Sequence, residues 1–155
     1  MKSEDFEKLI DKEKYQVFVF ACPACMPFTF AVHPWFVVNK KSVISIWEIK
    51  YYRNSNDKTY LHKNNQGPYQ GIEIIPYLRK FIYKSRLIGY VEGDENSFIK
   101  RISDFIENSK ENYPYLGEYS LTGPNSNTYV EWVLSNFPDS EIKLPWNSFG
   151  KNYKK

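Results

Sequence analysis

The fold of this chain is decided by residues 28–52, which read Phe28-Thr-Phe-Ala-Val-His-Pro-Trp-Phe-Val-Val-Asn-Lys-Lys-Ser-Val-Ile-Ser-Ile-Trp-Glu-Ile-Lys-Tyr-Tyr52. β-branched and aromatic residues fill both ends of this stretch and a short polar run separates them, as in two antiparallel strands joined by a tight turn. Alternation places Val32, Phe36 and Val38 on one face of the first run, and Ala31, His33, Trp35 and Val37 on the other. We therefore predict strands over Phe28–Val38 and Val43–Tyr52.

The turn between these strands sets which residues face each other. A two-residue turn at Lys40-Lys41 pairs Asn39 with Ser42 and places His33 directly opposite Glu48. Opposed Cβ atoms lie about 4.5–5.5 Å apart, so the Glu48 carboxylate could fix the tautomer of the imidazole and stabilise its protonated form. The alternative is a half-buried pair that only stabilises the sheet, and a one-residue slip would abolish the pairing.

The segments outside this hairpin complete an α+β pattern. Strands are predicted at Gln16–Phe20 and Arg86–Val91, a helix from the N-cap Ser3 to near Lys14, a helix capped by Asp94 that carries Phe98, Ile102 and Phe105 at helical spacing, and a last helix ending near Asn136. Lys58–Tyr69 reads as a surface loop, and Gly71–Lys84 is ambiguous between helix and strand. The prediction is an antiparallel sheet with packed helices.

Length and composition bound the class of protein. The 155 residues, 42% hydrophobic and 25% charged, suit one folded domain over residues 1–155, with residues 1–14 as an N-terminal helix. No apolar run approaches the roughly 18 residues of a membrane-spanning helix, and no secretory signal opens the chain, so we expect a soluble, cytoplasmic protein. Most of the aromatic side chains are expected in the core, with the segment Leu144–Tyr153 extended and packed by its aromatic residues.

The charged and metal-binding residues argue against two classes of ligand. Twenty-one Lys and Arg against eighteen Asp and Glu leave a net charge of +3, without the clustered basic stripe that nucleic-acid binding needs. The two cysteines and two histidines of the chain do not have the spacing of a structural zinc site. We expect no nucleic-acid partner, no metal and no cofactor.

A second candidate site is the turn Gly123-Pro-Asn-Ser-Asn-Thr128, which directly precedes an apolar helical pattern. Backbone N–H groups at a helix N-terminus can stabilise an oxyanion, and Ser126 could act there as a nucleophile. The alternative needs no chemistry, because Asn125 or Ser126 would serve as an N-cap.

These motifs together resemble known families. Ala31-Val-His-Pro-Trp-Phe-Val-Val38 is similar to the His strand, and Asn125-Ser-Asn-Thr-Tyr-Val130 to the nucleophile motif, of the circularly permuted papain-like fold, which includes NlpC-type and lecithin:retinol acyltransferase-like enzymes. With the segment Leu144–Tyr153, the Gly-Pro-Asn-Ser-Asn-Thr block more closely resembles an uncharacterised bacterial domain family over residues 15–153. The resemblance implies a permuted papain-like architecture for this core.

That architecture implies an amide or ester hydrolase or an acyltransferase acting on a small-molecule, peptide or lipid acyl substrate. Ser126 would attack the acyl carbon, His33 would transfer the proton, and Glu48 would orient His33. Backbone groups near Asn125 and Asn127 would hold the oxyanion. The relatives carry Cys where this chain has Ser126, and a serine alkoxide is much harder to form than a thiolate. The alternative is therefore a non-catalytic binding module of the same fold for a peptide, glycan or lipid fragment.

A third candidate function rests on Cys22-Pro-Ala-Cys25, which has the spacing of a redox dithiol. In a thioredoxin-like protein this motif opens a helix. Here a proline and β-type residues follow it, which predicts a turn between two strands. We therefore expect both cysteines to be dispensable for function.

Overall fold

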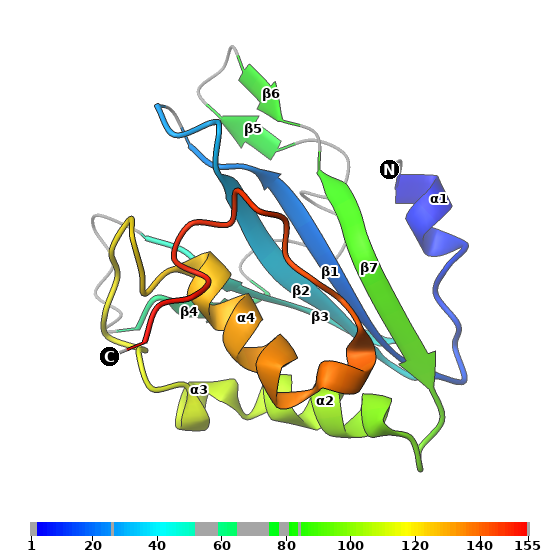
Figure 1. The fold of residues 1–155 in the computed structure, drawn as a ribbon. Helices are drawn as coiled ribbons and strands as arrows, with labels where there is room; N and C mark the ends of the chain where they lie inside the picture. The colour runs from blue at the N-terminus through cyan, green and yellow to red at the C-terminus, as the bar shows by residue number, and fades with distance from the viewer. Residues whose placement is uncertain are drawn as a thin grey trace.

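A five-stranded antiparallel sheet organises the protein (Figure 1). The computed structural model describes residues 3–25, 27–51, 59–64, 75–77, 81–83 and 85–154. Across the sheet the strands are ordered β4 (Leu61–Lys63), β3 (Val43–Ile49), β2 (Val32–Lys40), β1 (Tyr15–Pro23) and β7 (Arg86–Gly93). The predicted antiparallel sheet with packed helices is confirmed.

Helices, one 3₁₀ turn and a separate two-stranded hairpin complete the described elements. They are the helices α1 (Ser3–Glu7), α2 (Phe98–Glu107), α3 (Ser109–Asn112) and α4 (Ser126–Asn136), the 3₁₀ turn η2 (Pro138–Ser140), and the separate hairpin of β5 (Ile75–Tyr77) and β6 (Phe81–Tyr83). Within the described segments, no helix combines the length and apolarity needed to cross a membrane.

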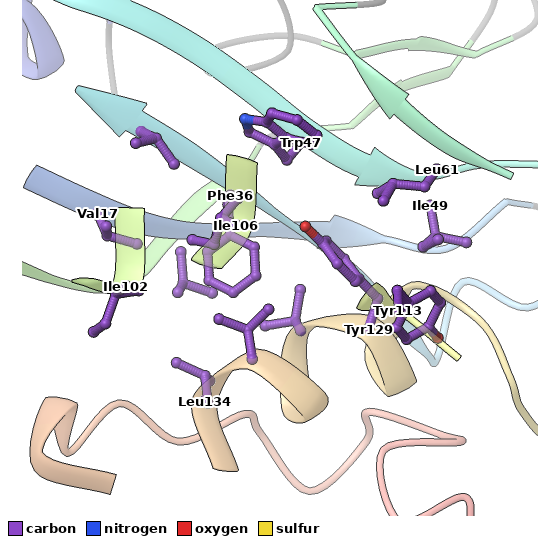
Figure 2. Close-up of a cluster of buried hydrophobic side chains, with 14 of the residues drawn as sticks. Val17, Phe36, Trp47, Ile49, Leu61, Ile102, Ile106, Tyr113, Tyr129 and Leu134 are labelled. Atoms are coloured by element: carbon purple, nitrogen blue, oxygen red, sulfur yellow. The ribbon is translucent and has the colours of Figure 1, made fainter. Parts of the chain in front are cut away.

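The two faces of the sheet bury different sets of side chains. On the first, which we call the α4 face, Val17, Phe36 and Trp47 pack with Ile106 of α2 and Tyr129 of α4 (Figure 2). The Tyr129 hydroxyl is fully buried and is satisfied by the Ser109 hydroxyl at 2.9 Å. Large apolar side chains and one paired hydroxyl therefore account for the position of α4 over β2 and β3.

The opposite face, which we call the α1 face, has a smaller core. Phe6 of α1 packs edge-on against Phe18 and Phe20 of β1, and Phe20 stacks on Trp35 of β2. The alternation predicted for residues 32–38 is thus confirmed, because Phe36 and Val38 lie on the α4 face, and Trp35 and Val37 on the α1 face.

The predicted register of the β2–β3 hairpin is wrong by two residues, because each β2 residue faces the β3 residue two positions beyond its predicted partner. Lys40 pairs with Val43, so the turn residues are Lys41 and Ser42, which have positive φ angles of 49° and 78°. Positive φ at both central residues is the geometry of a type I′ turn, whose twist matches the flanking strands. The Asn39 side chain holds this turn by accepting the Ser42 N–H at 2.9 Å.

Several predicted boundaries are also corrected. The second strand begins at Val32 rather than Phe28, because the Ala31 N–H bonds to the Phe28 carbonyl in a turn at 2.9 Å. The third strand ends at Ile49, and Tyr52 lies outside the described residues.

The remaining corrections concern the helices and the long loop. The first helix ends at Glu7, α2 is capped at Ser97 rather than Asp94, and the predicted loop at 58–69 contains β4. In the segment 71–84, β5 and β6 are described and the other residues are not.

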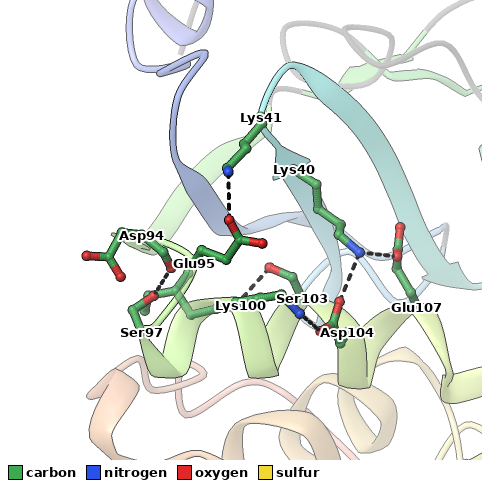
Figure 3. Close-up of polar contacts among 10 residues, drawn as sticks. Lys40, Lys41, Asp94, Glu95, Ser97, Lys100, Ser103, Asp104 and Glu107 are labelled. Atoms are coloured by element: carbon green, nitrogen blue, oxygen red, sulfur yellow. Dashed lines mark hydrogen bonds and ion pairs between the residues drawn. The ribbon is translucent and has the colours of Figure 1, made fainter.

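A network of ion pairs joins the β2–β3 turn to α2 (Figure 3). Lys40 Nζ lies 2.9 Å from Asp104 and 2.7 Å from Glu107, and Lys100 Nζ lies 2.7 Å from the second oxygen of Asp104. Burial raises the pKa of the Asp104 carboxyl, but hydrogen bonds from Lys100 and Lys40 outweigh it, and the net pKa is lowered. The network fixes the end of the sheet that lies far from the candidate sites.

Candidate functional site

His33 and Glu48, the predicted base and orienting acid, come together on the α1 face. The Nε2 atom of His33 lies 3.5 Å from Oε2 of Glu48, and the Glu48 side chain is 4% exposed. Continued along the strands, the observed register places Trp35 rather than His33 opposite Glu48. The shift preserves the faces, so the two are diagonal neighbours, and their predicted contact across the strands is confirmed although their direct opposition is wrong.

Other polar groups share the surroundings of Glu48. Lys50 Nζ lies 3.7 Å from Oε1 of Glu48, and His62 of β4 is the residue paired with Glu48 on its other side. His62 Nε2 lies 3.2 Å from the Lys50 carbonyl oxygen. His62, which the sequence left without a role, thus belongs to the same polar cluster. The charge of Glu48 faces a lysine as well as the imidazole of His33.

Ser126, the predicted nucleophile, is the first residue of α4 and lies on the other side of the sheet. Its helix packs on the α4 face, where Tyr129 contacts Phe36. The imidazole of His33 points to the α1 face, as its tilted contact with Trp35 at 6.1 Å shows. In the described part of the chain no hydrogen bond joins Ser126 to His33, so the structure does not bring the predicted nucleophile and base together.

Asn125 is the N-cap of α4. Its side-chain oxygen accepts the backbone N–H groups of Asn127 at 2.9 Å and Thr128 at 3.4 Å, and the Thr128 hydroxyl accepts the Asn125 N–H at 3.0 Å. This reciprocal pair is a capping box. The Asn127 N–H, which the sequence offered to an oxyanion, is therefore already bonded within the protein.

The same block ties the C-terminal segment to the sheet. Asn127 Nδ2 donates to the carbonyls of Val32 at 3.1 Å and Phe149 at 2.9 Å, and the Thr128 hydroxyl donates to the Gly150 carbonyl at 2.7 Å. Asn125 Nδ2 donates to the Phe149 carbonyl as well, at 3.2 Å. These contacts explain the block as a structural clamp.

The predicted turn holds only one of the two cysteines, because Cys22 is still part of strand β1 and Cys25 lies in the loop after it; both are free thiols. Cys22 is buried at the end of β1, and burial raises its pKa to about 12. Cys25 is exposed in the loop that follows. A thiol with so high a pKa is a poor nucleophile at neutral pH, so Cys22 is poorly suited to act as the attacking thiol of a redox dithiol.

Exposed aromatic rings gather where the β1–β2 loop meets the C-terminal segment. We call this set, made of Phe28, Phe30, Trp146 and Phe149, the aromatic end. Trp146 is 85% exposed, Phe30 62%, Phe149 44% and Phe28 37%. Phe30 packs edge-on against Phe149, with ring centroids 5.8 Å apart, and against Phe28 at 6.2 Å. Single exposed apolar residues are ordinary, but a cluster of large rings marks an interaction surface.

An open pocket of about 320 Å³ adjoins these rings, lined by Thr122 and by residues 146 and 148–153. Its volume is at the lower end of the range for small-molecule sites. Ser148 lines it with a hydroxyl that is buried and makes no hydrogen bond among the described residues. Lys151 lines it as well and donates to the carbonyls of Leu144 and Pro145 at 3.4 and 3.3 Å. The pocket thus combines the aromatic residues 146, 149 and 153 with a largely polar lining that includes one cation, Lys151.

The sequence pattern does not predict this surface, because it places the four rings in a strand or in a packed tail. Phe28 and Phe30 were expected within a strand, and Trp146 within a packed, extended tail. The tail instead folds into successive turns, in which Ser148 N–H bonds to the Pro145 carbonyl and Lys151 N–H to the Ser148 carbonyl. The signal available was Pro27 before Phe28 and Pro145 before Trp146, since proline favours turns and disfavours continuous strands.

Metal binding finds no support in the described residues, which contain no group of three or more His, Cys, Asp or Glu side chains placed to hold an ion.

Comparison with known proteins gives one match. Residues 14–153 match the model of a family described as "Protein of unknown function (DUF3750)". A search of curated proteins and a search of solved structures each found no match to the chain. This match confirms the predicted resemblance to an uncharacterised domain family over residues 15–153. It does not show a relation to the papain-like fold.

Proposed function

The chain belongs to the DUF3750 family, whose function is unknown, and from its own geometry we propose that it is a non-catalytic binding domain that holds an apolar fragment at its aromatic end. The observation that carries the proposal is the 85% exposure of Trp146 beside the pocket that it shares with Phe149. A single exposed ring is ordinary, but a tryptophan that lines a pocket beside other exposed rings is typical of a binding surface, where aromatic rings are the usual anchors.

The pocket supports the proposal through its chemistry. Its rings offer stacking and apolar contact, the Ser148 hydroxyl is free to bond a ligand, and Lys151 supplies a positive charge. Sites of this kind use a few polar groups to orient a mostly apolar ligand. Peptide, glycan and lipid fragments all offer such a combination, and the experiment below separates them.

The acyl-transfer function is less well supported by the same geometry. Ser126 and His33 lie on opposite faces of the sheet, and the Asn127 N–H that an oxyanion would need already bonds to Asn125. A nucleophile and its base must lie within hydrogen-bond reach, allowing for looser geometry before substrate binds. The contact between His33 and Glu48 favours the enzyme only in part, because a sheet-stabilising pair accounts for it equally well.

A permuted papain-like architecture remains part of the proposal as the frame of the binding domain. It is supported by the order of elements, in which strand β2 with His33 precedes the helix α4 that starts at the Asn-Ser-Asn block. The hydrogen bond from Asn127 Nδ2 to the Val32 carbonyl holds the start of that helix against the strand. The binding proposal does not depend on this architecture.

A ligand panel followed by isothermal titration calorimetry tests the proposal. The probes are dihexanoylphosphatidylglycerol below its micelle concentration, a chito-oligosaccharide and an apolar tripeptide. We expect saturable binding of one class, lost in Trp146→Ala and retained in Ser126→Ala and His33→Ala. Binding that survives Trp146→Ala, or labelling of Ser126 by a serine-hydrolase probe, contradicts the proposal and supports the enzyme.

A further inference from the structure

Hydrogen bonds fix the backbone segments that carry the rings of the aromatic end. The loop that carries Phe30 is bonded to the C-terminal segment, because the Val32 N–H donates to the Asn147 carbonyl at 3.3 Å and Asn147 Nδ2 donates to the Phe30 carbonyl at 2.8 Å. Phe149 is held in turn by the Asn125 and Asn127 amides on its carbonyl. The exposed rings are therefore presented by a fixed backbone, which lowers the entropy lost on binding.

The exposed rings of the aromatic end suit a surface that binds at the boundary between water and lipid. Phe30 and Trp146, the two most exposed rings of the set, come from two separate segments, the β1–β2 loop and the C-terminal segment, which the hydrogen bonds of Asn147 join. Trp and Phe side chains on projecting loops insert at the boundary between lipid headgroups and acyl chains, where their apolar rings leave water. Insertion of this kind requires no membrane-spanning helix.

The charges around the aromatic end favour an anionic partner. The residues of the β1–β2 loop carry no charge, and the segment 144–154 carries Lys151 and Lys154 without any acidic residue. The neighbouring segment 118–124 contributes one acid, Glu118. A basic flank beside apolar rings is attracted by a surface of anionic lipid.

We propose that the aromatic end docks on the surface of an anionic lipid bilayer, with Trp146 and Phe30 inserted among the headgroups and Lys151 and Lys154 facing lipid phosphates. This inference rests on the proposed function and names its partner. The lipid fragment in the pocket then comes from a bilayer rather than from solution. Salt weakens the association, because the lysine contribution is screened.

Vesicle sedimentation with the full chain tests the inference. The vesicles are phosphatidylcholine alone and phosphatidylcholine with phosphatidylglycerol. We expect binding to the anionic vesicles, a blue shift of tryptophan fluorescence, and a loss of about tenfold or more in partitioning for Trp146→Ala and for Phe30→Ala. Of the four tryptophans, Trp35 and Trp47 are buried and Trp132 is half-buried against the core, so the shift reports mainly on Trp146.

Two control variants separate insertion from general effects. Val43→Ala removes an equally exposed apolar side chain from the distant β2–β3 turn, where Val43 is 69% exposed, and should change partitioning by less than about twofold. Lys12→Gln is the charge control for Lys151→Gln combined with Lys154→Gln, which should abolish the preference for anionic vesicles. Circular dichroism melts establish that each variant folds.

The outcomes distinguish this inference from the proposed function. Binding of dihexanoylphosphatidylglycerol without binding to vesicles overturns the bilayer inference and leaves the binding domain standing. Absence of binding to the vesicles and to all three probes of the ligand panel overturns both. Vesicle binding that is unchanged in Trp146→Ala overturns the inference, as does a concentration-dependent dimer that is lost in Trp146→Ala, because the aromatic end then joins two copies of the chain.

Discussion

Replacement of Asn125 by alanine should strongly destabilise the protein, although the residue performs no chemistry in this account. Its side chain is almost fully buried and caps α4 by accepting two backbone N–H groups. Its amide also donates to the carbonyls of Ser120, Leu121 and Phe149 at 3.1–3.2 Å. Alanine removes all of these bonds at once.

The expected loss follows from these contacts. Removal of an N-cap costs about 0.5–2 kcal/mol, and each buried polar group left without a partner costs about 1–3 kcal/mol. Water can enter near the surface and satisfy some of the released groups, so we expect a total of about 2–4 kcal/mol. For a chain of this length, 3 kcal/mol lowers the melting temperature by roughly 6–12 °C.

Urea denaturation followed by circular dichroism measures the free energy of unfolding. Asn125→Asp keeps the capping acceptor but turns a carboxylate oxygen towards three carbonyl oxygens, so its destabilisation should be large at neutral pH and ease as the carboxyl group is protonated. The matched control is Asn136→Ala at the other end of α4. The Asn136 amide donates to the Trp132 carbonyl at an exposed site, so its removal should lower the free energy of unfolding by less than about 0.5 kcal/mol. Equal losses for Asn125→Ala and Asn136→Ala would refute the clamp.

Three further predictions rest on other parts of the structure. Gly150→Ala should lower the free energy of unfolding, measured by urea denaturation, by more than about 1–2 kcal/mol, because φ at Gly150 is 86° and the new Cβ would lie 2.6 Å from the side-chain amide of Asn125. Alanine at the exposed Gly117 is the control and should be nearly neutral, so equal effects at the two positions would contradict the prediction. Iodoacetamide at mildly alkaline pH should modify Cys25 and not the buried Cys22, as peptide mass spectrometry would show, whereas rapid modification of Cys22 would contradict the burial that raises its pKa. Because the pKa of Asp104 is lowered, its ion pairs stabilise the fold at pH values above the ordinary carboxyl pKa of 3.8, and this contribution is lost as the pH falls through the lowered pKa. Asp104→Asn should therefore make the free energy of unfolding depend less on pH in the acid range, and an unchanged dependence would contradict the ion-pair network.

The sheet could be predicted from the sequence because its residues obey a local rule. Strict alternation in the second strand assigns Phe36 and Trp35 to opposite faces, whatever the rest of the chain does. The position of the turn could be predicted only to within one residue, since Lys40-Lys41 and Lys41-Ser42 are both polar pairs, and moving the turn by one residue moves the strand pairing by two. The type I′ turn is selected by the backbone twist and by the Asn39 side chain. A shift of this size leaves the faces unchanged, and the contact of His33 with Glu48 was therefore within reach.

The relation between Ser126 and His33 could not be predicted in the same way. No local pattern tells which face of the sheet α4 covers, because that depends on how Tyr129 and its apolar neighbours pack against Phe36. The exposure of Trp146 likewise depends on the turns of the C-terminal segment, which are held by Asn125 and Asn127 far from it in sequence. Long-range contacts of this kind leave no periodic signal.

Mapping of the ligand site by NMR tests the central claim of this account most directly. The native protein, labelled with ¹⁵N, is titrated with dihexanoylphosphatidylglycerol below its micelle concentration. The account predicts that the largest amide shift changes fall in the β1–β2 loop around Phe30 and in residues 146–151, with little change at His33 and Glu48. Changes centred on His33, Glu48 and Ser126, with the aromatic end unaffected, would contradict it.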